Sequence, residues 1–285
     1  MKIVRFLGGL GNQMFQYTLY KALKKRFPKV KADLYWFDGY NRHYGYELEK
    51  IFGIRISKAS EFESVLYDIH NRRWIFRKLR RLLNLKKAYQ EETDLFSFDP
   101  NILTDKNSAY YWGYWQNLNY FQDIEKEIRA DFVFTTPSDS RNLQILERIR
   151  NSNSISIHVR RGDYLTDPLL GGLCELDYYE NGVSHMQAHI KSPKYFVFSN
   201  DIPWCKNNLN ISDCEFISWN DGEQSHIDMQ LMAECKHNII ANSSFSWWAA
   251  WLNPNPKKIV IAPTKWVNDP TINTSGLIPN TWLSI

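Results

Sequence analysis

The sequence predicts an α/β fold with two Rossmann-like halves. In the C-terminal half, short apolar runs alternate with helical segments, which is typical of a parallel sheet. The most regular run, 155–160, alternates apolar and polar residues with the period of a strand. Near the N-terminus, a strand at 2–7 leads through a glycine-rich loop into a helix at 12–27. This opening predicts a second α/β half.

The N-terminal half is regular only at its two ends. The first helix should stop before Pro28, because proline cannot continue a helix. Residues 40–150 are rich in aromatics and show little periodicity. The other N-terminal elements that we predict are a strand at 31–36 and helices at 119–132 and 138–150.

The C-terminal half reads as an ordered succession of strands and helices. Each apolar run of about five residues is followed by a turn and a helical segment, as in βαβ units. We predict strands at 155–160, 194–199, 215–219, 237–241 and 258–262, and helices at 177–190, 203–209, 225–235 and 243–252.

A short polar run separates the two halves. Residues 151–154 read Asn-Ser-Asn-Ser and precede the most regular strand, so they are the best candidate linker. We therefore predict one domain at 1–150 and a second at 151–285.

Composition limits the class of protein. The chain has 285 residues and 44% hydrophobic residues, enough for a sizeable core. Its 11 Trp and 16 Tyr can serve as core residues or as flat surfaces for sugars. Four cysteines lack metal-type spacing, so they predict free thiols in a reducing compartment. No apolar run suits a signal peptide or a membrane span, so we expect a cytoplasmic protein.

A basic segment stands out against a net charge of +4. Residues 72–87 hold eight Lys or Arg residues and no acidic one, and Ile75, Leu79, Leu82 and Leu83 recur at helical spacing. Such a helix could bind an anionic membrane surface, or its apolar residues could pack on its own domain. We do not expect nucleic acid as a partner, because no nucleic-acid module accompanies the run.

Charged residues gather where the main strand ends. His158, Arg160, Arg161 and Asp163 lie at or just after its carboxyl end, where open α/β sheets bind ligands. Guanidinium groups match phosphate oxygens and stay charged, so the two arginines suit a diphosphate. The alternative is a surface turn with solvated charges.

A polar turn precedes the last helix. Asn242, Ser243, Ser244 and Phe245 could place hydroxyl and N–H groups around an anion, although a plain N-cap would explain one serine. No Asp-x-Asp motif occurs, so we expect no metal and no cofactor. Arginines and the N–H groups at a helix N-terminus would then stabilise the negative charge of a departing diphosphate.

Three motifs together resemble the α-1,2-fucosyltransferases of glycosyltransferase family 11. They lie at 8–17, 158–164 and 227–248, and the resemblance covers residue 3 to about 266. It implies the GT-B-like arrangement, with two Rossmann-like domains facing a central cleft. The N-terminal domain would then lie on the acceptor side, and the C-terminal domain would bind GDP-fucose.

The resemblance also assigns residues within the C-terminal domain. His158 and Arg160 match residues that contact the nucleotide and its phosphates, and Arg161 matches the second arginine. The 242–245 turn matches a nucleotide-binding turn. Asp228 matches an acidic position that could accept hydrogen bonds from guanine, or it could simply complement the helix dipole.

Two further assignments concern the sugar and the reaction. Gly8, Gly11, Asn12 and Gln13 match a loop that reaches the donor near the fucose, although Gly9 stands where many members have Arg. The alternative for this loop is a simple glycine-rich turn. Asp163 could be a general base, or it could orient an arginine by an ion pair.

The resulting expectation is an inverting, metal-independent transfer of L-fucose from GDP-β-L-fucose to the 2-hydroxyl of a terminal galactose. The acceptor would be an oligosaccharide. A lipid-linked acceptor would place the reaction at the inner face of the cytoplasmic membrane. The alternatives are a glycosyltransferase that uses another sugar nucleotide and a non-catalytic protein that binds glycans or nucleotides.

Overall fold

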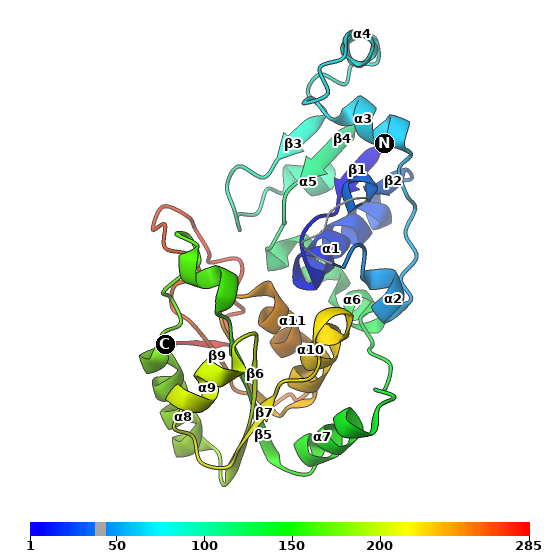
Figure 1. The fold of residues 1–285 in the computed structure, drawn as a ribbon. Coiled ribbons are helices and arrows are strands. Elements are labelled where there is room, and N and C mark those ends of the chain that lie inside the picture. The colour runs from blue at the N-terminus through cyan, green and yellow to red at the C-terminus, as the bar shows by residue number, and fades with distance from the viewer. Residues whose placement is uncertain (38–43) are drawn as a thin grey trace. The chain divides into compact units, whose positions relative to one another are not determined.

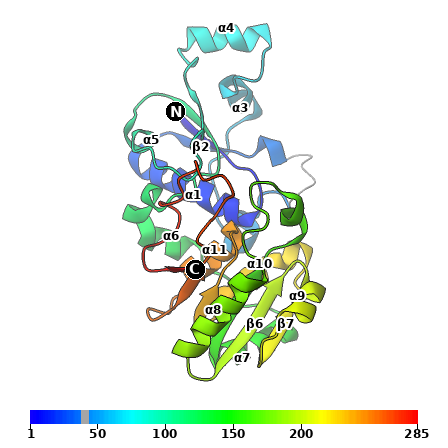
Figure 2. The same cartoon turned by 90° about the vertical axis from the view of Figure 1, so that its left-hand side faces the viewer.

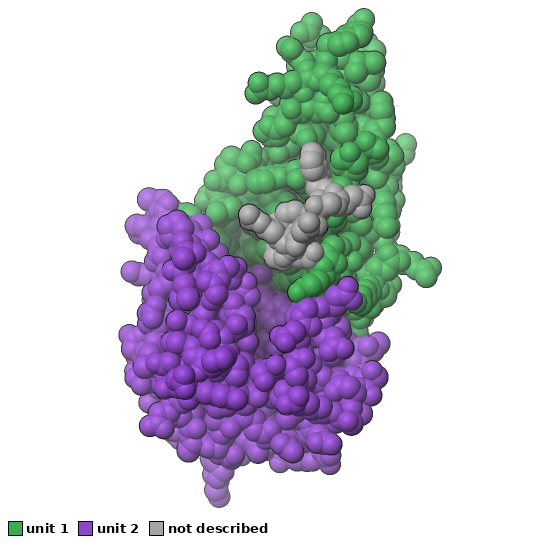
Figure 3. All heavy atoms as spheres, viewed as in Figure 1, with its two compact units in different colours: residues 1–133, 272–277 green, residues 134–271, 278–285 purple. Residues whose placement is uncertain are grey.

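The computed structural model describes residues 1–37 and 44–285, except the side chain of Trp36. The described chain divides into two compact units (Figure 3). Unit 1 comprises residues 1–133 and 272–277, and unit 2 comprises residues 134–271 and 278–285. The predicted linker at 151–154 is not where the units separate. Residues 140–150 form a helix that packs against other elements of unit 2, so they belong to unit 2 and not to the predicted N-terminal domain.

Unit 1 contains a parallel sheet. Its described strands are ordered β2-β1-β4-β3, and every neighbouring pair is parallel (Figure 1). The chain crosses from one side of β1 to the other between β2 and β3, so the strand order reverses between β1 and β4. The strands are β1 (Lys2–Arg5), β2 (Val30–Asp33), β3 (Tyr89–Glu91) and β4 (Ala109–Trp112).

Helices and short turns fill the rest of unit 1. Helix α1 (Leu10–Arg26) follows β1 and is buried along most of its length, because its apolar residues surround the axis. The other helices are η1 (Tyr35–Phe37), α2 (Leu48–Phe52), α3 (Glu61–Tyr67), α4 (Trp74–Leu82), α5 (Asn101–Thr104), η2 (Leu118–Tyr120), η3 (Gln122–Ile124) and α6 (Glu125–Asp131).

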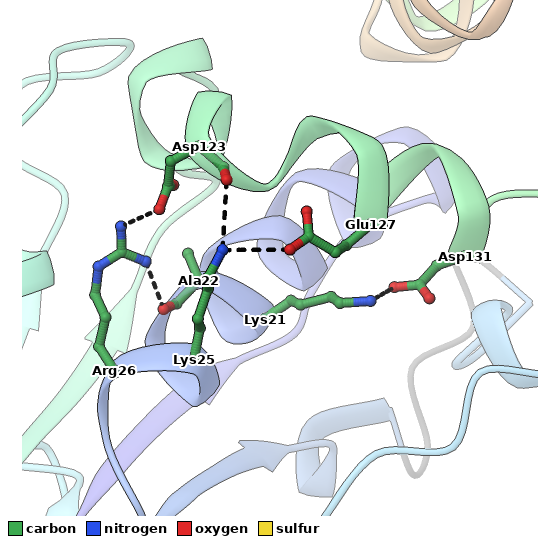
Figure 4. Close-up of polar contacts among 7 residues, drawn as sticks. All are labelled: Lys21, Ala22, Lys25, Arg26, Asp123, Glu127 and Asp131. Carbon is green, nitrogen blue, oxygen red and sulfur yellow. Dashed lines mark hydrogen bonds and ion pairs between the residues drawn. The ribbon is translucent and has the colours of Figure 1, made fainter.

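Ion pairs fasten the C-terminal part of α1 to η3 and α6 (Figure 4). Lys21 pairs with Asp131, while Lys25 Nζ lies 3.2 Å from Glu127 and Arg26 Nη2 lies 2.7 Å from Asp123. Basic residues near a helix C-terminus also suit its dipole. All three pairs are partly exposed, so each contributes little to the free energy of unfolding. Their main effect is to align α1 with η3 and α6.

Unit 2 contains a second parallel sheet. Its described strands are ordered β10-β9-β8-β5-β6-β7, with every neighbouring pair parallel. The chain runs outward from β5 through β6 to β7, then returns to the other side of β5. The strands are β5 (Asn153–Val159), β6 (Pro193–Ser199), β7 (Cys214–Ile217), β8 (His237–Ile239), β9 (Val260–Ala262) and β10 (Leu283–Ser284).

Helices connect these strands (Figure 2). They are α7 (Ser140–Arg150), η4 (Gly162–Thr166), α8 (Leu176–His189), α9 (Ile202–Asn208), η5 (Gly222–Gln224), α10 (Ser225–Glu234) and α11 (Ser244–Leu252). Each predicted C-terminal element is present within a few residues. Two parallel sheets with intervening helices confirm the predicted α/β class with two Rossmann-like halves, as the GT-B-like class requires.

The central strand β5 is buried on both faces. Ile155, Ile157 and Val159 belong to the main apolar core of unit 2. The two serines of the strand are also buried and have partners: Ser154 Oγ accepts from the Lys236 amide and Ser156 Oγ from Asn238 Nδ2. Because these hydrogen bonds satisfy its serines, a strand that alternates apolar and polar residues can lie in the interior of the sheet.

The less regular segment departs from prediction in two places. The strand expected at 31–36 covers Val30–Asp33, and η1 follows it. The helix expected at 119–132 is broken into η2, η3 and α6. Among the helices of residues 1–37 and 44–285, none has the length and apolar character that spanning a bilayer requires.

Candidate functional site

The strand order of unit 2 marks a binding position. The chain leaves β5 toward β6 on one side and returns to form β8 on the other, so the order reverses between β5 and β8. In open α/β sheets, ligands bind beyond the carboxyl ends of the strands at such a point. The segment after β5 begins with Arg160, and the segment after β8 leads through Asn242 into α11.

Tyr164 joins these two segments. Its hydroxyl donates to the Asn242 carbonyl at 3.4 Å, and it also interacts with the Ser243 side chain. The guanidinium carbon of Arg160 lies 5.2 Å from the centre of the Tyr164 ring. The arginine motif and the serine turn, which are about 80 residues apart in sequence, therefore form one local site.

Asp163 holds Arg160. Its two carboxylate oxygens lie 2.8 and 2.9 Å from Arg160 Nη2. The Asp163 side chain is 63% exposed and that of Arg160 is 33% exposed. The outer end of the guanidinium is thus paired and reaches solvent, whereas its Nε atom is buried and has no hydrogen-bond partner in the described residues.

His158 has a similar unsatisfied atom. The residue is 6% exposed, and its Nδ1 lacks a hydrogen-bond partner among the residues that the structure describes. Burial, together with the charge of Arg160, lowers the pKa of His158 to about 3, so the imidazole is neutral near pH 7. Its ring centre lies 5.8 Å from that of Phe245.

Two buried polar atoms without partners, on residues two positions apart, are unusual. A buried unsatisfied group costs about 1–3 kcal/mol, so most such groups in folded proteins are paired. Residues i and i+2 of an extended chain share a face, which places His158 and Arg160 on the same side of the β5 end. These atoms point to a ligand that supplies hydrogen-bonding oxygens.

Arg161 is fixed by neighbours from the next strand. Its Nε donates to Asp201 at 3.2 Å, its guanidinium stacks 4.0 Å from the Trp204 ring centre, and its amide donates to Asn200 Oδ1. Since Asn200 and Asp201 follow β6 directly, they come to the same sheet edge as Arg161. Neither residue was predicted as part of the site, although polar residues directly after a predicted strand were the available signal.

The turn after the arginines requires glycine. Gly162 has φ +60°, a conformation that side chains disfavour, and a Cβ there would lie 2.5 Å from Asn200 Nδ2. A side chain at this position would therefore strain the turn into η4 and displace the Asn200 side chain.

The serine turn begins α11 with one serine as its cap. Ser243 Oγ accepts from the Phe245 amide at 3.4 Å, and Ser243 is buried. Asn242 serves the protein itself, because its Nδ2 donates to the Leu170 and Trp266 carbonyls and its Oδ1 accepts from the Cys174 thiol. We therefore see Asn242 as the residue that anchors this turn.

Asp228 belongs to a buried polar network at the same edge of the sheet. Asn220 Nδ2, just after β7, donates to Asp228 Oδ1 at 2.7 Å, and Asn142 exchanges hydrogen bonds with Asn220. Burial raises the pKa of Asp228 to about 7 despite the Asn220 hydrogen bond. Neither Asn142 nor Asn220 was predicted as part of the site, because no local sequence pattern distinguishes them.

The glycine-rich loop of unit 1 is stabilised by its own side chains. Gly8 has φ +77°, and a Cβ there would lie 2.8 Å from Asn12 Nδ2. Gln13 is buried, donates to the Gly8 and Gly45 carbonyls and accepts from the Glu47 amide. Since both amide hydrogens of Gln13 are used inside unit 1, its side chain positions the loop.

The neighbouring residues complete this loop. Asn12 Oδ1 accepts from Gln116 Nε2 at 2.9 Å, and Gly11 lies buried in the first turn of α1. Elsewhere, no cluster of three or more His, Cys, Asp or Glu side chains suited to a metal ion occurs in the described part of the chain.

Comparisons with known proteins give a consistent picture. The model of the family described as glycosyl transferase family 11 matches residues 1–285. An α-1,2-colitosyltransferase of Escherichia coli is 33% identical over 99% of this chain and 98% of that protein. The O-antigen biosynthesis glycosyltransferase WbnK of Escherichia coli is 33% identical over 98% of each chain.

A more distant relative and a solved structure extend the comparison. The galactoside α-(1,2)-fucosyltransferase 1 of Saimiri sciureus is 28% identical over 47% of this chain and 40% of its own length. The crystal structure of the fucosyltransferase NodZ from Bradyrhizobium matches with a TM-score of 0.52 and 15% identity, over 89% of this chain and 92% of that one. The latter likeness concerns the fold.

Proposed function

Because the chain belongs to glycosyltransferase family 11, whose model matches residues 1–285, we propose that it transfers L-fucose from GDP-β-L-fucose to the 2-hydroxyl of a terminal galactose. The observation that carries the donor site is the pair of buried unsatisfied atoms, His158 Nδ1 and Arg160 Nε, at the switch point of unit 2. A diphosphate would supply the oxygens that both atoms lack.

Arg160 stabilises the departing GDP. Its Nε donates to a phosphate oxygen, and its charge offsets the negative charge that develops as the glycosidic bond to fucose breaks. The neutral imidazole of His158 donates a second hydrogen bond from Nδ1 in the tautomer that carries its hydrogen there. Arg161, stacked on Trp204, adds a fixed positive charge through its Nη groups.

The start of α11 completes the phosphate site. Helix N-termini favour anions through their N–H groups and dipole, and Tyr164 links this turn to the arginine motif. We assign Ser243, Ser244 and Phe245 to nucleotide contact, with Asn242 holding the turn in place.

Asp228 reads the guanine base. An ionised carboxylate accepts hydrogen bonds from the guanine N1–H and amino groups. Asn220 fixes one carboxylate oxygen at 2.7 Å, which orients the group before the nucleotide binds. With its pKa raised to about 7, Asp228 is ionised only in part near neutral pH, and guanine binding would favour the ionised form.

Asp163 has two candidate roles. Its bidentate contact with Arg160 Nη2 supports a positioning role, because it directs the buried Nε toward the ligand. The general-base role remains a separate hypothesis in which Asp163 takes the proton of the attacking hydroxyl. Asp163→Asn distinguishes them: a base would lose most turnover and the acidic limb of the pH profile, whereas a positioning residue would mainly raise the KM for the donor.

We further propose that the reaction inverts the anomeric carbon and needs no metal. In-line attack by the galactose hydroxyl on the β-linked donor yields an α-linked product. In unit 1, Gly8, Gly11 and Asn12 form the loop that we assign to the donor near its sugar, with Gln13 as its positioning residue.

The first experiment is transfer of labelled fucose from GDP-fucose to lactose with EDTA present, followed by linkage analysis. An α-1,2-linked product would support donor, linkage and metal independence together. GDP binding without transfer across a broad acceptor panel would instead favour a non-catalytic binding protein. Failure to bind GDP would refute the donor site.

A colitose donor is the second candidate. It is favoured by the α-1,2-colitosyltransferase, which matches nearly this whole chain at 33% identity. Competition between GDP-fucose and a nucleotide-activated colitose decides between the two donors. Faster transfer of colitose would overturn the fucose assignment while leaving the phosphate site intact.

A further inference from the structure

The basic segment 72–87 divides into buried and exposed parts. Phe76 and Leu79 pack against the apolar cluster of unit 1 that includes Leu66, Leu85 and Tyr110. The helix therefore uses part of its apolar surface to attach to its own domain, which was one of the two alternatives that the sequence left open.

One of the eight basic residues is structural. Arg80 is 5% exposed, and its guanidinium donates to the carbonyls of Leu66, Asp68 and Asn71. Those carbonyls come from the end of α3 and the loop after it, so Arg80 fixes α4 to α3. Figures 1 and 2 both show α4 beyond α3, as the outermost element of unit 1.

The opposite face of α4 carries apolar side chains into solvent. Trp74 is 72% exposed and Leu82 is 79% exposed. With Lys78 they follow the i, i+4, i+8 spacing of one helix face, which is the face turned away from Phe76 and Leu79. Ile75, seven residues before Leu82, is 48% exposed and extends this apolar surface.

Seven exposed cations surround these apolar residues. Beside Lys78, the helix carries Arg77 and Arg81, and no ion pair with another described residue neutralises any of the three. The other four lie in the segments that flank α4. All seven are exposed: Arg72, Arg73, Arg77, Lys78, Arg81, Lys86 and Lys87.

We propose that α4 and its flanks dock on an anionic lipid surface. The cations match the charge of acidic headgroups, while Trp74 and Leu82 enter the boundary between headgroups and acyl chains. A phosphate backbone of nucleic acid would satisfy the cations but offers no apolar layer for Leu82 and Ile75. This assignment is independent of the donor site, and it would place the enzyme where a lipid-linked acceptor is presented.

The test is flotation of the full-length protein with phosphatidylcholine vesicles that do or do not contain phosphatidylglycerol. We expect binding only with the anionic lipid, weakened by salt because exposed charges are screened. Arg77→Gln/Lys78→Gln/Arg81→Gln should reduce affinity on the order of 100-fold, at roughly fivefold for each charge near the surface.

A matched control separates location from net charge. Lys106, Lys126 and Lys257 are exposed and lie outside the segment, so their triple replacement by Gln removes the same charge. It should leave vesicle binding unchanged within about threefold, since distant charges are screened. Trp74→Ser/Leu82→Ser should weaken binding while preserving the cations.

Other outcomes would overturn the proposal. These are no binding of the wild-type protein to anionic vesicles, or equal losses in the α4 and control variants. Binding to a mixed-sequence RNA but not to vesicles would reassign the surface to nucleic acid. Transfer of fucose to lactose, a soluble acceptor, should be the same in the α4 variants and the wild type, so failure of this proposal is distinguishable from failure of the donor site.

Discussion

Replacing Arg160 with alanine is the most direct perturbation of the proposed donor site. The change removes the buried Nε donor and the positive charge together, and it leaves Asp163 without its partner. A charge-assisted hydrogen bond contributes about 1.5–3 kcal/mol. The charge adds an electrostatic contribution that is reduced here, because the side chain is 33% exposed and already paired with Asp163.

The two contributions together correspond to about 3–4 kcal/mol in the transition state, or a loss of turnover on the order of 10²–10³. The assay is initial-rate transfer of fucose to lactose, with GDP affinity measured separately by calorimetry. We expect the larger effect on kcat, because charge develops on the leaving group only as the bond breaks.

Arg148→Ala is a matched control. Arg148 also makes an arginine–carboxylate pair, with Glu215 at 2.9 Å, but it lies on α7 and its side chain is 53% exposed. Its removal should change turnover less than about twofold, because an exposed pair contributes little. Turnover of Arg160→Ala within about twofold of wild type, with folding intact, would refute the role that we assign to Arg160.

Three further predictions concern other parts of the chain. Burial raises the pKa of Asp228 to about 7, so GDP affinity, measured by calorimetry, should fall about tenfold per pH unit below pH 7. The free energy of unfolding, measured by chemical denaturation, should fall as pH rises from about 4 toward 7. Asp228→Asn should remove both dependences. Gly162→Ala adds a steric clash to an unfavourable φ, so it should destabilise by about 1–3 kcal/mol and weaken GDP binding. Gly172→Ala, at φ +70° and with the nearest atom, Glu175 Oε1, at an ordinary contact distance of 3.9 Å from the added Cβ, should cost less and leave GDP binding unchanged. Arg80→Ala should lower the free energy of unfolding by about 1.5–3 kcal/mol in urea titrations, because it loses hydrogen bonds to three carbonyls. Arg81 is exposed, so Arg81→Ala should change the free energy of unfolding by less than about 0.5 kcal/mol.

Local periodicity was enough to predict the elements of unit 2. Buried parallel strands carry apolar runs, and the intervening helices have recognisable starts and stops, so elements such as β5 and α11 lie close to their predicted ranges. The helix expected at 119–132 was less successful. Its pattern does not reveal that the chain changes direction between η2, η3 and α6, because that depends on packing against α1.

Part of the geometry of the proposed donor site could be predicted from the sequence. Arg160, Arg161 and the serine turn could be predicted, because each follows a recognisable strand and parallel strands end at one edge. What each side chain does there was not accessible. Sequence reasoning grouped Asn242 and Gln13 with the ligand contacts, but their amides are used to bind distant backbone groups.

The sequence by itself thus determined the α/β class, the family and the chemical character of the residues at the strand ends, because these depend on local pattern and residue type. Only the tertiary structure decided which groups are satisfied. It left His158 Nδ1 and Arg160 Nε without partners, turned Arg80 inward and left Trp74 in solvent. Burial and hydrogen-bond partners come from segments far apart in the chain, so no local pattern encodes them.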